Sequence, residues 1–235
     1  MRLFCMKGVV CAVGLCGIAV FSGCSGPQTR QTEVTPARLS AIADELIELA
    51  ADDQRYEQMV MNNEIPGDRD EFMATKKRLM SVRGQRCKAI FEEIGFPDYE
   101  MVGQEASDGF WVIVQHNDTD PVFQERVAKA MRGPVERGAA DGSKLAYLTD
   151  RVLINTDRPQ MYGTQLTYIH EQARAIPKEL GDPAGVDARR AAVGLEPLSV
   201  YMNGSSELFF MMNEAPLREM GVTEPFVYEA GFSAW

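Results

Sequence analysis

The residues whose types could do chemistry gather first in residues 115–120, which read QHNDTD. An imidazole, His116, lies here beside the carboxylates of Asp118 and Asp120. Histidine exchanges a proton near neutral pH, and a carboxylate can orient its ring. We therefore treat His116 as a candidate general acid or base, oriented by Asp118 or by Asp150. Asp120 precedes a proline and is better explained as the N-cap of a helix. The alternative for His116 is a histidine that only packs in the core.

A second polar stretch, PQMYGTQ, covers residues 159–165. Turns use Gly, Pro, Asn, Asp and Ser for their geometry and do not need two glutamines beside a tyrosine and a threonine. We interpret the stretch as part of a ligand-binding pocket. Arg189 and Arg190, later in the chain, could bind a carboxylate or a phosphate of the ligand. The alternative is a hydrogen-bonded network that only holds the fold together. The candidate ligand-binding residues are Gln115, Arg151, Gln160, Tyr162, Thr164, Gln165 and Arg189.

Other kinds of site have weaker support. A metal centre needs three or more convergent ligands, and one histidine with two aspartates in a loop could start one, but the sequence has no HExxH motif and no Cys-His pattern. His170, the only other histidine, lies in an expected hairpin turn. The chain has no GxSxG elbow, no GxxxxGK[ST] loop and no GxGxxG motif. We therefore predict no metal and no cofactor, and leave open whether the protein is an enzyme.

The elements that must position these residues are mostly helices. Apolar periodicity, caps and breakers predict helices near residues 36–62, 68–94, 103–117, 120–138, 143–155, 183–194 and 197–203, with a β-hairpin near residues 164–177. The fold class is therefore mainly α, a single helical domain of six to eight helices with one small β-hairpin.

The fifth helix is apolar around its circumference, which predicts burial. It nevertheless carries Asp150 and Arg151, and buried charges need partners. These two residues are therefore expected to converge with a set of polar side chains: His116, Gln160, Tyr162 and Gln165.

The N-terminus predicts the compartment. Residues 1–23 combine Arg2 and Lys7 with a short apolar run that ends in Ser-Gly before Cys24. The pattern is that of a secretory signal, and the run is too short to span a membrane. It resembles a lipoprotein signal, so Cys24 is the expected lipidation site and the membrane the expected partner. The predicted location is the bacterial cell envelope, with the outer membrane favoured by Ser25 where the host has one.

The domain organisation follows from this reading. Residues 1–23 form the signal peptide, 24–34 a polar tether, 35–204 the helical domain and 205–235 a C-terminal extension. Loss of the signal and lipidation of Cys24 leave Cys87 as the one unmodified cysteine, so no disulfide framework is expected. Cys87 falls in a seven-residue repeat of apolar residues, which indicates burial rather than reactivity. The net charge of −10 excludes a nucleic-acid partner.

Four longer motifs follow one another in order: GFPDYEMVG, WVIVQHNDTDPVFQ, YLTDRVLINTDRPQMYGTQ and DPAGVDARRAAVGLEPL. With them the chain resembles the bacterial family of unknown function 6624 over roughly residues 79–202. A weaker match to the family, ADDQR, lies in the first helix. In the second helix the chain departs from the family's pattern at Arg83 and Arg86, where shorter polar residues are expected. The resemblance implies no activity or cofactor. The favoured function is binding of a small polar envelope ligand; the alternatives are a hydrolase-like enzyme using His116 and an interaction lipoprotein without a pocket.

Overall fold

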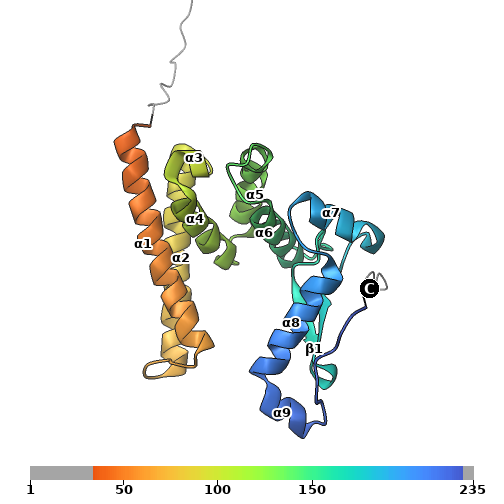
Figure 1. The fold of residues 1–235 in the computed structure, drawn as a ribbon. Helices are drawn as coiled ribbons and strands as arrows, with labels where there is room; N and C mark the ends of the chain where they lie inside the picture. The colour runs from red at the N-terminus through yellow and green to blue at the C-terminus, as the bar shows by residue number, and fades with distance from the viewer. Residues whose placement is uncertain (1–33, 230–235) are drawn as a thin grey trace, which may run out of the picture. The chain divides into compact units, whose positions relative to one another are not determined.

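The computed structural model describes residues 34–229, which Figure 1 draws as a coloured ribbon. They belong to one compact unit of the chain that begins at Val34. The predicted signal peptide, the lipidation site Cys24 and the tether up to residue 33 lie outside the described residues, as do the last six positions of the predicted C-terminal extension. None of the described helices is long and apolar enough to cross a membrane.

The structure confirms the mainly α fold class with one small hairpin. The first part of the chain forms six helices: α1 (Pro36–Met61), α2 (Arg69–Ile94), α3 (Tyr99–Val102), α4 (Gln104–His116), α5 (Pro121–Glu136) and α6 (Gly142–Asn155). The hairpin pairs β1 (Leu166–Ile169) with β2 (Arg174–Pro177) in antiparallel register, joined by a 3-10 turn at His170–Gln172. A second 3-10 turn (Pro183–Gly185) and the helices α7 (Val186–Ala192), α8 (Leu198–Met212) and α9 (Glu214–Glu219) follow.

Helix starts and breaks follow local chemistry. Thr35 and Asp68 accept backbone hydrogen bonds as the N-caps of α1 and α2. Asp120 caps α5 in the same way, as expected from its place before a proline. Helix α4 corresponds to the helix predicted over 103–117. The short helix α3, which was not predicted, precedes it, and Gly103 separates the two with a positive φ of 80°. Pro134 lies inside α5, which continues to Glu136.

The main core lies among α1, α2, α4, α5 and α6. Fully buried apolar side chains on the first three include Ile42, Leu46, Ile90 and Phe110. Cys87 belongs to the same cluster and is 0% exposed, which confirms its predicted burial, whereas Met73 of the same seven-residue repeat is 38% exposed. This core holds the N-terminal helices together and sets the spacing of the polar residues at their edge.

Two smaller clusters lie in the C-terminal part. One joins Val186, Leu198 and Met202 to Tyr228, and the other joins Phe210 to Leu217. Helix α8 is longer than the helix predicted from residue 197 to 203 and ends at Met212. The expected domain boundary at residue 204 therefore falls inside a helix. The nine α-helices among residues 34–229 also exceed the expected six to eight.

Candidate functional site

His116 is the last residue of α4, and its ring meets a carboxylate of α1. Nδ1 lies 2.6 Å from Oδ2 of Asp53, whose side chain is only 2% exposed, while the His116 side chain is 22% exposed. The geometry is that of a histidine oriented by a buried carboxylate through one ring nitrogen. Among the described residues, the acidic partners of His116 are Asp53 and, more distantly, Glu57.

The packing of α1 on α4 explains why these two residues meet. Leu46 and Asp53 are seven residues apart on α1, and Gly109 and His116 are seven apart on α4, so each pair shares one helix face. A Cβ at Gly109 would lie 3.0 Å from the Leu46 carbonyl oxygen. The missing side chain therefore lets the two helices approach closely, and the next contact along the same faces is Asp53 with His116.

Helix α2 supplies the cation of the site. Arg83 is 3% exposed and donates through Nη1 to Oδ1 of Asp53 at 3.4 Å and through Nη2 to Asp52. Its guanidinium also lies over the ring of Tyr56, 5.4 Å from the centroid. Arg83 thus binds the Asp53 oxygen that His116 does not contact, and it pairs with a charge that burial alone would make costly.

Glu57 completes a group of three possible metal ligands with Asp53 and His116. The ligand atoms of the three lie within 4.8 Å of one another. Glu57 forms an ion pair with Lys76 at 2.7 Å, and Asp53 already pairs with Arg83. A dication at this place would have to compete with both cations, so the arrangement favours proton chemistry over metal binding.

Asp118, expected to orient His116, instead joins α4 to α6. Both its oxygens accept from Arg151, at 2.7 and 2.8 Å, and Asn155 donates to it at 2.9 Å. Burial alone would raise the pKa of Asp118, but the hydrogen bonds and charge of Arg151 hold that pKa below its ordinary value. The expected ligand-binding residue Arg151 is therefore half of a bidentate ion pair. Neighbouring Gln115 accepts at its backbone carbonyl from Gln124.

Asp150, the other carboxylate expected at His116, is a structural anchor. It is 0% exposed and accepts from the backbone amides of Met161, Tyr162 and Thr164, and from the Thr164 hydroxyl. Burial raises the pKa of Asp150, and these hydrogen bonds act in the opposite direction. A single carboxylate thus folds the segment after α6 back onto that helix.

The side-chain amides of Gln160 and Gln165 form hydrogen bonds within the PQMYGTQ segment and to Lys178. The Gln160 side chain is 0% exposed, donates to the carbonyls of Gln165 and Lys178, and accepts from the Gln165 amide. The Gln165 side chain donates to Thr164. Of the six residues expected to converge, Asp150, Gln160, Tyr162 and Gln165 lie in this network, whereas the contacts of His116 are with Asp53 and Glu57.

The two neighbouring arginines of α7 also serve the segment. Arg189, an expected ligand-binding residue, donates to the Met161 carbonyl at 2.8 Å and to Asp182 at 2.7 Å. Arg190 is 1% exposed and donates to the carbonyls of Tyr162 and Glu196. Both guanidinium groups therefore fasten the loops around α7.

Sequence reasoning missed Asp53, Glu57 and Arg83 as site residues. Asp53 belongs to the ADDQR motif of the first helix. Because Asp53 is seven residues from Leu46, it lies on the apolar face of that helix. A charged residue on a face expected to be buried was the signal that could have found it. Arg83 was noticed only as a departure from a family pattern, although it is the partner that this buried aspartate requires.

The comparisons identify a family without assigning an activity. A model of a family of unknown function, DUF6624, matches residues 40–210, which is well over half of the chain. No curated protein and no solved structure matched the chain. The chain therefore belongs to the DUF6624 family.

Proposed function

We propose that this member of the DUF6624 family is an exported, lipid-anchored protein whose helical domain carries an acid–base site at His116. The site acts on a small polar substrate of the cell envelope. The observation that carries the proposal is the 2.6 Å contact between His116 Nδ1 and the buried Oδ2 of Asp53. Family membership supports no particular reaction, so the proposal rests on the chemistry of these residues.

The contact gives the two ring nitrogens of His116 different roles. With Nδ1–H donating to Asp53, Nε2 is the nitrogen that can take a proton from a water molecule and later return it to a leaving group. Asp53 holds the ring in one tautomer and orientation, and Arg83 holds Asp53. A general base of this kind suits a hydrolase-like reaction in which water is the nucleophile.

Burial supports this role over a purely internal ion pair. Asp53 and Arg83 are both nearly inaccessible, whereas the side chains of His116 and Glu57 are 22% and 26% exposed. The positioning groups are thus inside and the group that exchanges protons is within reach of solvent. This gradient is what a pre-organised acid–base site needs.

The other functions expected from the sequence have less support. Binding of a small polar ligand by Gln160, Tyr162, Gln165 and Arg189 would need donors and acceptors that the fold itself already uses. Binding of a ligand near His116, without catalysis, stays compatible with the same contacts. The third alternative, an interaction lipoprotein without a site, has no specific contact in its favour.

The two histidines of the chain allow a matched test of the proposed reaction. Chromogenic esters, phosphate esters and glycosides are screened with the unmodified protein, with His116→Gln and with His170→Gln. We expect any hydrolysis found to fall by about 10²–10⁴ in His116→Gln, the usual contribution of a general base. His170→Gln should retain it. Equal rates in the two variants, or no turnover of any substrate class, would contradict the enzymatic proposal.

Lipid anchoring is tested separately. Cells given labelled palmitate should label the unmodified protein and not its Cys24→Ala variant, because the thiol of Cys24 is the proposed attachment point. A matched Cys16→Ala variant should still be labelled. Label retained in Cys24→Ala would place the lipid elsewhere and refute this part of the proposal.

A further inference from the structure

The β-hairpin has two different faces. On one face the Tyr168 ring stacks on Phe209 of α8 with ring centroids 4.5 Å apart, and the backbone amide of Ala175 donates to Ser206 of the same helix at 2.9 Å. Residues alternate along a strand, so the opposite face carries Arg174 and its cross-strand partner Ile169. Helix α8 thus covers one face, and the other face borders open space.

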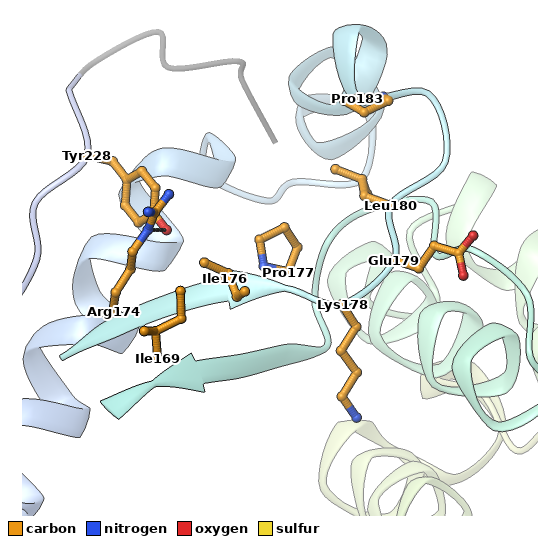
Figure 2. A pocket seen from close by; sticks show the side chains of 9 residues that line it. All are labelled: Ile169, Arg174, Ile176, Pro177, Lys178, Glu179, Leu180, Pro183 and Tyr228. Carbon is orange, nitrogen blue, oxygen red and sulfur yellow. Dashed lines mark hydrogen bonds between the residues drawn. The ribbon is translucent and has the colours of Figure 1, made fainter. Parts of the chain in front are cut away.

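That open face is the floor of a cavity of about 420 Å³. Its apolar lining consists of Ile169, Ile176, Pro177, Leu180 and Pro183. Figure 2 shows Arg174 and Tyr228 at one end of this lining and Lys178 and Glu179 at the other. The volume falls in the range of small-molecule sites, roughly 300–1,000 Å³.

Arg174 is the fixed charge of the cavity. Its Nε donates to the Tyr228 hydroxyl at 2.8 Å, and that hydroxyl donates to the Ala175 carbonyl at 2.6 Å. The guanidinium also stacks over the ring of Phe226, 4.4 Å from the centroid. These contacts, made by Nε and by the face of the guanidinium, hold the side chain in place. The two terminal nitrogens are the pair that can bind a carboxylate bidentately.

The charge of Arg174 has no carboxylate partner among residues 34–229, although acids outnumber bases in the chain by 34 to 24. Lys178 and Glu179 are exposed, adjacent and of opposite charge, so they add no net charge at the rim. The guanidinium of Arg174 is therefore half-buried, held in one orientation and without a carboxylate partner among these residues, and it lies beside apolar walls. This combination indicates a binding site for an anionic ligand.

We propose that this cavity binds a small carboxylate that has an apolar body. The carboxylate pairs with the terminal nitrogens of Arg174, and the hydrocarbon lies along Ile169, Ile176 and Leu180. This site uses none of the residues of the proposed acid–base site. Its ligand class follows from the combination of one cation with a hydrocarbon-lined floor.

The test uses three probes that separate charge from apolar contact. Octanoate, octylammonium and acetate are titrated calorimetrically into the unit from Val34 to Trp235, after circular dichroism has shown it to be helical. We expect octanoate to bind at least about tenfold more tightly than either other probe, because only octanoate can use both the guanidinium and the apolar lining. Equal binding of octanoate and octylammonium, or no binding of octanoate, would overturn the proposal.

Two matched variants then locate the site. Arg174→Gln should weaken octanoate binding by at least about tenfold, since a charge-assisted pair is lost. Lys77→Gln, at an exposed position of α2 outside the cavity lining, should change it by less than about twofold. Unchanged binding in a folded Arg174→Gln protein refutes the assignment. Binding seen only after removal of residues 230–235 refutes it too, because the chain's own end would then be the occupant.

Discussion

Asp53 and His116 are 63 residues apart in the chain, and their side chains meet with Oδ2 2.6 Å from Nδ1. The contact is made where a buried face of α1 reaches the C-terminal end of α4. It joins an inaccessible carboxylate to a partly exposed imidazole, and Arg83 contacts the other oxygen of that carboxylate. The proposed function depends on this relationship, and the predictions below test it and the fold that supports it.

The first prediction concerns the site's packing. Gly84 of α2 faces Asn117, the neighbour of His116, and a Cβ there would lie 2.2 Å from Asn117 Nδ2 and 2.8 Å from its Cγ. Gly84→Ala should therefore destabilise the domain by about 1–3 kcal/mol, because a buried side chain must move. Urea unfolding measures the change.

Gly204 of α8 is the control for Gly84. It is exposed, and a Cβ there would meet nothing within 4 Å. Gly204→Ala should stabilise the domain by about 0.5–1 kcal/mol, because alanine loses less conformational entropy than glycine in a helix. A stabilising Gly84→Ala would show that Asn117 does not pack against α2 as described.

The second prediction concerns the anchor at Asp150. Asp150→Ala leaves three backbone amides and the Thr164 hydroxyl without their acceptor. Since each unsatisfied buried group costs about 1–3 kcal/mol, we expect a large loss of stability, seen as a lower midpoint of thermal unfolding. Glu136→Ala, an exposed position near the end of α5, should leave the midpoint almost unchanged. Similar midpoints for the two variants would contradict the anchor.

Much of the fold could be predicted from the sequence, because the helices carry their own signals. Thr35, Asp68 and Asp120 are local caps whose hydrogen bonds need no distant partner. The long α8 was underestimated beyond residue 203, since its burial depends on contacts with the hairpin and not on a local pattern. The short α3 has only four residues, too few for a period to be recognised.

The site was harder to predict than the fold for the same reason. His116 was singled out because histidine is rare and chemically versatile. Its partner Asp53 lies on another helix, and nothing within residues 115–120 points to it. Asp118 is nearer to His116 in sequence, but closeness in a loop does not fix where a side chain points. The carboxylate of Asp118 pairs with Arg151 instead. Long-range pairing of helices decides such contacts.

The third prediction is a dependence of stability on pH. Arg151 lowers the pKa of Asp118 below its ordinary 3.8, so the ion pair stabilises the fold above that pH and the stabilisation is lost as pH falls through the lowered value. Because Asp118 is partly exposed, the contribution should stay under about 1 kcal/mol. Urea unfolding of the unmodified protein and Arg151→Gln should differ near neutral pH and converge well below pH 3.8. A difference that persists in acid would mean that Arg151 acts through packing.

The fourth prediction concerns the thiol in the core. Burial raises the pKa of Cys87 far above its ordinary value, so the reactive thiolate is absent in the folded protein. In the unit from Val34 to Trp235, where Cys87 is the single cysteine, a maleimide should react only after unfolding in guanidinium. Rapid reaction of the folded protein would contradict the packing of α2 into the core.

The most direct test of the central claim is the ¹⁵N NMR spectrum of the two histidine rings at mildly alkaline pH. We expect neutral His116 to be protonated on Nδ1, because that nitrogen donates to Asp53, and we expect Asp53→Asn to remove this preference. His170 supplies the internal reference and should not respond to Asp53→Asn. A His116 ring protonated on Nε2 in the unmodified protein, or a spectrum unchanged by Asp53→Asn, would contradict the claim that Asp53 orients His116 for proton transfer.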